Sequence, residues 1–78
     1  MEPAVAFGLV VRRLRQKAGL SQEQLGFEAE LRRTYVSILE LGQQQPSLMT
    51  IIKLARALNL TASELLGLVE EELSAPAP

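Results

Sequence analysis

The side chains best suited to recognising a ligand gather in one short stretch, Arg32-Arg33-Thr34-Tyr35-Val36-Ser37. An arginine guanidinium can donate two parallel hydrogen bonds to O6 and N7 of guanine. Serine and threonine hydroxyls can bond base edges or phosphates, and a threonine methyl group can lie against the methyl group of thymine. The stretch therefore has the chemistry of a nucleic-acid contact surface.

The composition excludes most active-site chemistry. The 78 residues contain no His, Cys, Asp or Trp, and all nine acidic residues are Glu. Cys/His zinc sites, Ser-His-Asp triads, cysteine nucleophiles and disulfides are therefore impossible. The sequence patterns of a P-loop and an EF-hand are also missing. We expect no enzymatic activity, no metal and no cofactor.

The formal net charge of −1 hides an asymmetry along the chain. Residues 1–61 hold all eight Lys and Arg with five Glu, whereas residues 62–78 hold four Glu and no base. A nearly neutral domain can thus present one basic face to an anionic partner. The three aromatic residues are too few to stack single-stranded nucleic acid. No apolar run is long enough to span a membrane or follows a basic start, so we expect a cytoplasmic protein.

Local start and stop signals predict five helices and no strands. Ser21 with Gln24, and Thr61 with Glu64, have the spacing of capping boxes, and Gly19 can end the first helix. The expected helices are Ala4–Ala18, Gln22–Ala29, Arg33–Leu41, Leu48–Leu58 and Ala62–Leu73. No stretch alternates polar and apolar residues as a strand would. We expect an all-α, compact five-helix domain over residues 1–73 and a disordered tail over residues 74–78.

The predicted second and third helices are short and are joined by a very short turn, which is typical of a helix-turn-helix. In that motif the second helix of the pair enters the major groove of DNA, which is wide enough to admit it. Val36 and Leu39 would hold this helix on the core. The other face would then carry the polar side chains named above.

Four segments carry a resemblance to the lambda repressor/Cro-like (XRE-type) helix-turn-helix family. They are GLSQEQL at residues 19–25, LRRTYVSILELG at 31–42, PSL at 46–48 and LARAL at 54–58, and the match covers nearly all of residues 7–67. The run from Arg33 to Ser37, together with the small size, is also similar to the controller proteins of restriction–modification systems. The resemblance implies a five-helix domain that binds double-stranded DNA as a two-fold dimer on a palindromic operator.

The resemblance also implies roles for individual residues. Gln22 would bond a phosphate, the third helix would read bases, and Glu40 would form a structural ion pair with Arg12 or Arg15. The expected DNA contacts are Gln22, Arg32, Arg33, Thr34, Tyr35, Ser37, Ile38 and Gln43. Each of these residues also has an alternative, purely structural interpretation. The two arginines can be a solvated pair, and Tyr35 can pack on the core edge. Ile38 can either contact a thymine methyl group or cover the core. Gln22 can be an ordinary polar helix start, and Gln43 an ordinary loop residue.

Three positions depart from the family pattern. Glu30 stands in the turn where the family often has Gly, so either a Glu adopts a left-handed conformation or the turn differs. Ile38 stands where a polar base reader is common. Leu41 and Gln43-Gln44 stand where the family often has Arg, Lys or Asn near phosphates. The operator sequence of relatives therefore does not carry over to this chain.

The fifth predicted helix continues an apolar stripe through Leu68, Val69 and Leu73. Burying a Leu or Val is worth about 1.5–3 kcal/mol, so such a stripe should not stay in water. We expect a self-complementary dimer interface formed by these residues with Ile52. The alternative is that the stripe folds back on the first helix.

These observations predict a sequence-specific, double-stranded DNA-binding transcriptional regulator that acts as a homodimer and works by blocking or recruiting RNA polymerase. The alternative is a protein-interaction module, or an antitoxin, that uses the same fold to bind a protein. The exposed apolar positions Ile38 and Leu41 motivate that alternative.

Overall fold

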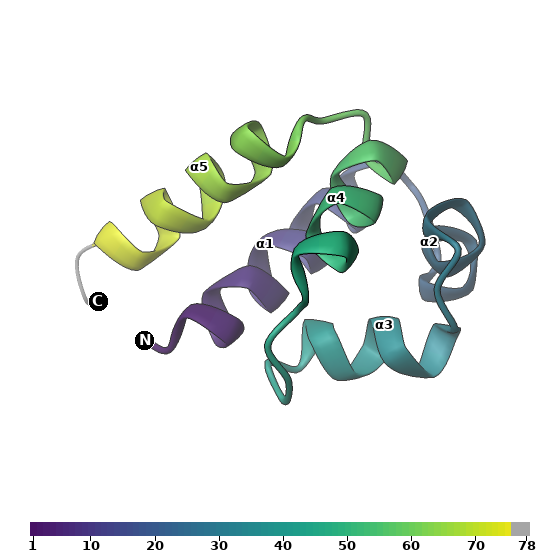
Figure 1. Ribbon diagram of the computed structural model, residues 1–78, viewed down its shortest axis with the longest axis horizontal. Coiled ribbons are helices and arrows are strands. Elements are labelled where there is room, and N and C mark those ends of the chain that lie inside the picture. Colours follow the sequence, from purple (N-terminus) through teal and green to yellow (C-terminus); the bar gives the residue numbers. More distant parts are fainter. Residues whose placement is uncertain (76–78) are drawn as a thin grey trace.

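Five helices form the part of the chain that the structure, a computed structural model, describes, which is residues 1–75 (Figure 1). They are α1 (Pro3–Lys17), α2 (Gln22–Ala29), α3 (Arg33–Glu40), α4 (Leu48–Ala57) and α5 (Ala62–Ser74). Residues 1–75 contain no strand, which confirms the predicted all-α fold, and every helix boundary lies within one residue of its expected position. Ser74 still belongs to α5, and the last three residues of the predicted tail lie outside the described residues.

Side chains at the helix starts satisfy backbone groups that have no partner within the helix. Ser21 Oγ accepts the Gln24 amide at 3.0 Å, while Gln24 Oε1 accepts the Ser21 amide at 2.8 Å. Thr61 and Glu64 form the same reciprocal pair at the start of α5. Both predicted capping boxes are therefore confirmed.

The turn between α2 and α3 is tight, and Glu30 is in the left-handed conformation at φ 58°. The Leu31 amide donates to Gly26 O at 2.7 Å, which closes the turn on the last part of α2. A Cβ atom at Gly26 would lie only 2.6 Å from Leu31 O. The close approach thus requires glycine at position 26, whereas position 30 accepts a glutamate in the strained conformation that the sequence left open.

The core draws on all five helices, with α1 packed against both α3 and α5. Its largest fully buried side chains are Leu25, Leu39, Leu54, Leu65, Val11 and Val36. α4 crosses in front of α1 in Figure 1 and packs against α2 and α5, while α3 lies along the lower edge. Gly8 brings α1 close to α3, because a Cβ atom there would contact Leu39 O and would lie 2.7 Å from Glu40 O. Glycine therefore permits close packing at two places, between α1 and α3 at Gly8 and in the turn before α3 at Gly26.

The apolar stripe of α5 divides between the core and the surface. Val69 is only 6% exposed and belongs to the core, and Leu68 is partly buried against it. Leu66 and Leu73 stand three residues before and four residues after Val69 on the same side of the helix, and they are 37% and 40% exposed. The alternative to the dimer interface, in which the stripe packs inside its own domain, thus applies to Val69 and Leu68. Val69 in particular leaves little surface for a partner.

Candidate nucleic-acid interface

The core clamps α3 along one side and leaves the other side open. Val36 and Leu39 are each 1% exposed, as the pattern of the third helix predicted. Arg33 and Thr34 are exposed on the outer side, and Ser37 and Ile38 are half-buried. The arginine-threonine start of α3 therefore points away from the core.

Four of the expected DNA contacts line one shallow depression on the outer side of α3. Its lining residues are Arg33, Thr34, Ser37 and Ile38, and its volume is about 220 Å³. The structure therefore brings these four residues together. All four side chains can therefore contact one bound ligand at the same time.

Arg32 precedes α3 as its N-cap residue and is exposed, but its side chain makes no capping hydrogen bond. The ion pairs found within residues 1–75 join Arg13 to Glu72 and Arg15 to Glu40, so Arg32 and its neighbour Arg33 are left without a carboxylate partner there. Two adjacent uncompensated guanidinium groups at the start of a helix favour an anionic ligand.

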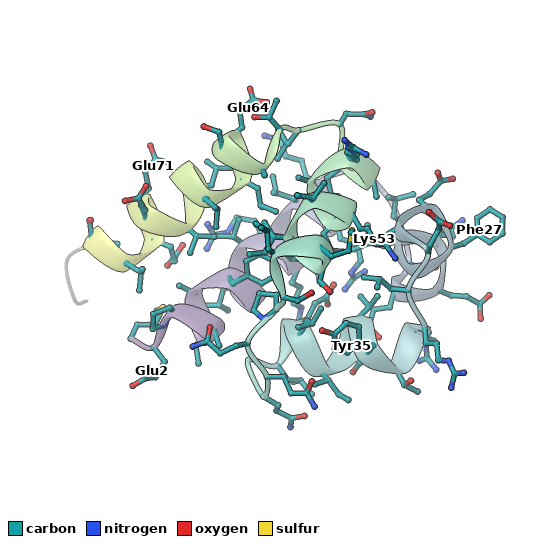
Figure 2. The ribbon with its side chains drawn as sticks, viewed as in Figure 1. Glu2, Phe27, Tyr35, Lys53, Glu64 and Glu71 are labelled. Carbon is teal, nitrogen blue, oxygen red and sulfur yellow. The ribbon has the colours of Figure 1, made fainter. Side chains whose placement is uncertain are left out.

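Tyr35 and Gln43 do not line the depression. Tyr35 is half-buried and packs against the core, on the side of α3 turned toward α4 (Figure 2). This is the core-edge position that the sequence left open. Gln43 is exposed in the loop after Gly42, where φ is 71°, so its amide is free to reach a phosphate beside the end of α3.

A buried polar network lies beneath α3 and ties it to α1 and α2. Arg15 Nε donates to Glu40 Oε2 at 2.6 Å, and Arg15 Nη2 donates to Glu40 Oε1 at 3.0 Å. Arg15 Nη1 donates to Leu20 O at 2.9 Å. The side chain of Glu40 is 3% exposed. The ion pair that the sequence assigned to Arg12 or Arg15 is thus made by Arg15.

The same network raises the pKa of Arg15 above its ordinary value. The hydrogen bond to Glu40 is the main cause, and the charge of Glu40 adds to it, although burial acts in the opposite direction. Arg15 therefore stays charged at neutral pH and balances the buried Glu40 carboxylate. The charge balance keeps α1 and α3 in a fixed arrangement.

Gln22 joins this network by donating from Nε2 to Glu40 Oε1 at 3.1 Å. Sequence reasoning missed this bond, because the two residues are eighteen positions apart and belong to different helices. An amide nitrogen carries two hydrogens, so one remains for a phosphate. Gln22 is the first residue of α2, where the helix dipole also favours an anion. The network thus orients the residue that the resemblance implied as a phosphate donor.

The outer side of α2 carries a surface that the sequence did not single out. Phe27 is 83% exposed and points away from the body of the protein (Figure 2). Together with Glu23, Gln24 and Glu28 it lines a shallow depression of about 250 Å³. We call these four residues the α2 outer surface. Its carboxylates would repel DNA phosphates, so it is distinct from the surface around α3.

Within residues 1–75, no three carboxylate side chains are grouped so that together they could hold a metal ion. No helix in that same range has the length and apolar content that a membrane crossing requires.

Comparison with known proteins gives the family. The helix-turn-helix family model matches residues 11–65. Control protein C.BamHI from Bacillus amyloliquefaciens is 44% identical over 61 residues, which make up 77% of this chain and 75% of that protein. The crystal structure of the restriction–modification controller protein C.AhdI from Aeromonas hydrophila is 48% identical, with a TM-score of 0.77, over 80% of this chain and 94% of that one.

A third protein shares the fold alone. It is the restriction–modification controller protein C.Esp1396I, which is 19% identical with a TM-score of 0.87, over 96% of this chain and 99% of that one. Its structure is that of a tetramer in complex with its natural 35 base-pair operator. The predicted resemblance to controller proteins is confirmed, and this chain belongs to the helix-turn-helix family that includes C.BamHI and C.AhdI.

Proposed function

We propose that the protein is a sequence-specific, double-stranded DNA-binding transcriptional regulator that acts as a homodimer on a palindromic operator. The observation that carries the proposal is the outward-facing group of Arg33, Thr34, Ser37 and Ile38 on a helix clamped to the core by its opposite side. The major groove of B-DNA, about 12 Å wide, admits such a helix. A protein of the same fold, C.Esp1396I, forms a complex with its natural operator, which supports DNA binding by this fold.

Contacts with phosphate position the helix in the groove. One guanidinium and two side-chain amides are available for these phosphate contacts. They belong to Arg32, Gln22 and Gln43. Amides bond phosphates without releasing counterions, so we expect binding to depend on salt less steeply than for a strongly basic regulator.

The dimer is assigned to the apolar surface that the core leaves uncovered. Leu66 and Leu73 are exposed on α5, and Met49 is exposed and Ile52 half-buried on α4, the helix that packs against α5. The domain measures 34 × 24 × 23 Å. The half-sites of a palindrome require third helices about one turn of B-DNA apart, roughly 34 Å, which is comparable to the length of one domain. Val69 and Leu68 are left out of this interface, because Val69 is buried in the core and Leu68 lines a depression with residues of α1.

The proposal assigns the protein no catalytic activity and places its action in the cytoplasm, on the DNA that it regulates. A DNA-bound dimer regulates by occupancy, since it can cover a promoter or hold RNA polymerase beside it.

Selection from a random duplex pool, followed by titration of the enriched duplex at several salt concentrations, tests the proposal. Arg33→Ala should weaken binding to the enriched duplex by about 1–3 kcal/mol, because a bidentate contact is lost. It should also relax the base preference at one guanine of the site. Arg56→Ala is the matched control, since Arg56 is an exposed arginine of α4 that lies in a different depression from Arg33. Failure to enrich any sequence would remove the proposed function.

The α2 outer surface favours a second function, which is binding of a protein partner. An exposed phenylalanine beside two carboxylates suits a basic segment, because arginine can both stack on the ring and pair with the glutamates. RNA polymerase is one such partner and a toxin is another. Phe27→Ser should leave the affinity for the operator unchanged and should weaken transcription activated from that operator. Equal activation by the original protein and by the Phe27→Ser variant would exclude the α2 outer surface as a partner-binding site.

A further inference from the structure

We propose that the depression on α3 is a socket for the C5 methyl group of a pyrimidine in the major groove, so that the protein reads thymine and 5-methylcytosine alike. The inference rests on the proposed DNA-binding function and adds the chemical group that one half of the site recognises. A consequence is that methylation of an operator cytosine would strengthen binding.

The lining residues form two parallel rows along the helix. Arg33 and Ser37 are four positions apart, as are Thr34 and Ile38, and residues at this spacing have Cβ atoms roughly 5–6 Å apart on one side of a helix. The depression of about 220 Å³ lies between these rows. One row carries a guanidinium and a hydroxyl, and the other carries a threonine methyl group and an isoleucine side chain. The depression therefore has a polar wall and an apolar wall.

Each wall matches a different feature of a base edge. The polar wall can bond guanine O6 and N7 through Arg33. The apolar wall offers no hydrogen bond from Ile38, so its natural complement is the one apolar group of the major groove, the C5 methyl of thymine. Ile38 is half-buried, which holds its side chain against the helix and leaves part of it for contact.

The spacing along α3 limits where the methyl group lies. Arg33 and Ile38 are five residues apart, which is roughly 7.5 Å of helix. Base pairs are spaced about 3.4 Å apart, so the methyl group is expected within about two base pairs of the guanine. Cytosine lacks the methyl group, but 5-methylcytosine carries it at the same ring position. The socket should therefore discriminate by methylation where the operator has a cytosine.

The test uses the full chain and the duplex enriched in the selection described above. Each thymine of the half-site is replaced in turn by deoxyuridine, which removes only the methyl group and keeps the base pair. We expect one position to lose about fourfold in affinity, the equivalent of burying one methyl group. At that position a C·G pair should bind about fourfold better when the cytosine carries a C5 methyl group, for the same reason.

Two variants assign the effect to the socket. Ile38→Ala should bring the affinity ratio of thymine to deoxyuridine close to one, whereas Leu41→Ala should leave it unchanged, because Leu41 is exposed on the same segment but does not line the depression. The ratio compares two duplexes on one protein, so a loss of stability in a variant cancels.

The outcomes separate the inference from the function on which it rests. A ratio that collapses only in Ile38→Ala supports the socket. An enriched duplex with no thymine-to-deoxyuridine effect at any position overturns the socket and leaves the regulator standing, and so does an effect that survives Ile38→Ala. A selection that enriches no duplex overturns both.

Discussion

Replacement of Gly8 by alanine probes the contact that sets the distance between α1 and the recognition helix α3. Alanine in a helix interior is favoured over glycine by about 0.5–1 kcal/mol, so a free position would gain stability. At Gly8 the new Cβ atom would instead contact Leu39 O and would lie 2.7 Å from Glu40 O, against 3.4–4 Å for an ordinary contact. Both neighbours are backbone atoms that no side-chain rotation can move.

The backbone of α3 must therefore shift by most of an ångström. Overpacking of this kind costs typically 1–3 kcal/mol and occasionally more, which exceeds the gain in helix propensity. We expect a net loss of about 2 kcal/mol for Gly8→Ala. For a domain of this size that corresponds to a fall in the midpoint of thermal unfolding of about 8–16 °C.

Gly67→Ala is the matched control, because Gly67 also lies inside a helix and a Cβ atom there would have no neighbour within 4 Å. It should raise the free energy of unfolding by about 0.5–1 kcal/mol. Thermal and urea unfolding followed by circular dichroism at one protein concentration measure both changes, because association makes the midpoint depend on concentration. A Gly8→Ala protein as stable as the Gly67→Ala protein would refute the close contact between α1 and α3.

Two further perturbations test the buried network and the dimer surface. Glu40→Ala leaves the part-buried Arg15 without its partner and should cost about 1.5–3 kcal/mol in urea unfolding, the range for hydrogen bonds to charged groups. Glu72→Ala breaks the exposed pair with Arg13 and should cost at most about 1 kcal/mol. Similar losses in the two proteins would contradict the burial of the network. Leu73→Glu should give monomers in sedimentation at unchanged helicity, since a charge in an apolar interface is costly; an unchanged mass would move the dimer interface elsewhere.

The sequence alone was sufficient for the five helices. Ser21 with Gln24 and Thr61 with Glu64 cap helices through hydrogen bonds that span three residues, and Gly19 ends α1 with a positive φ of 73°. Signals of this range are contained in any short window of the chain. The inward positions of α3 were predictable for the same reason, because helical spacing groups Val36 and Leu39 on one side.

The start of α3 was predicted as a recognition surface from residue types and from a resemblance that spans most of the domain. The grouping of Arg33, Thr34, Ser37 and Ile38 follows from helix geometry and needed only the knowledge of which side faces the core. The role of each residue on DNA remains a prediction.

Only the tertiary structure decided what covers each helix. It placed Val69 in the core and left Leu73, one turn further along the same apolar stripe, 40% exposed. It also paired Gln22 with Glu40 and left Phe27 in solvent. These outcomes depend on contacts between residues far apart in the chain. Whether a side chain is buried depends on which distant residues pack against it, and a short stretch of sequence does not contain that information.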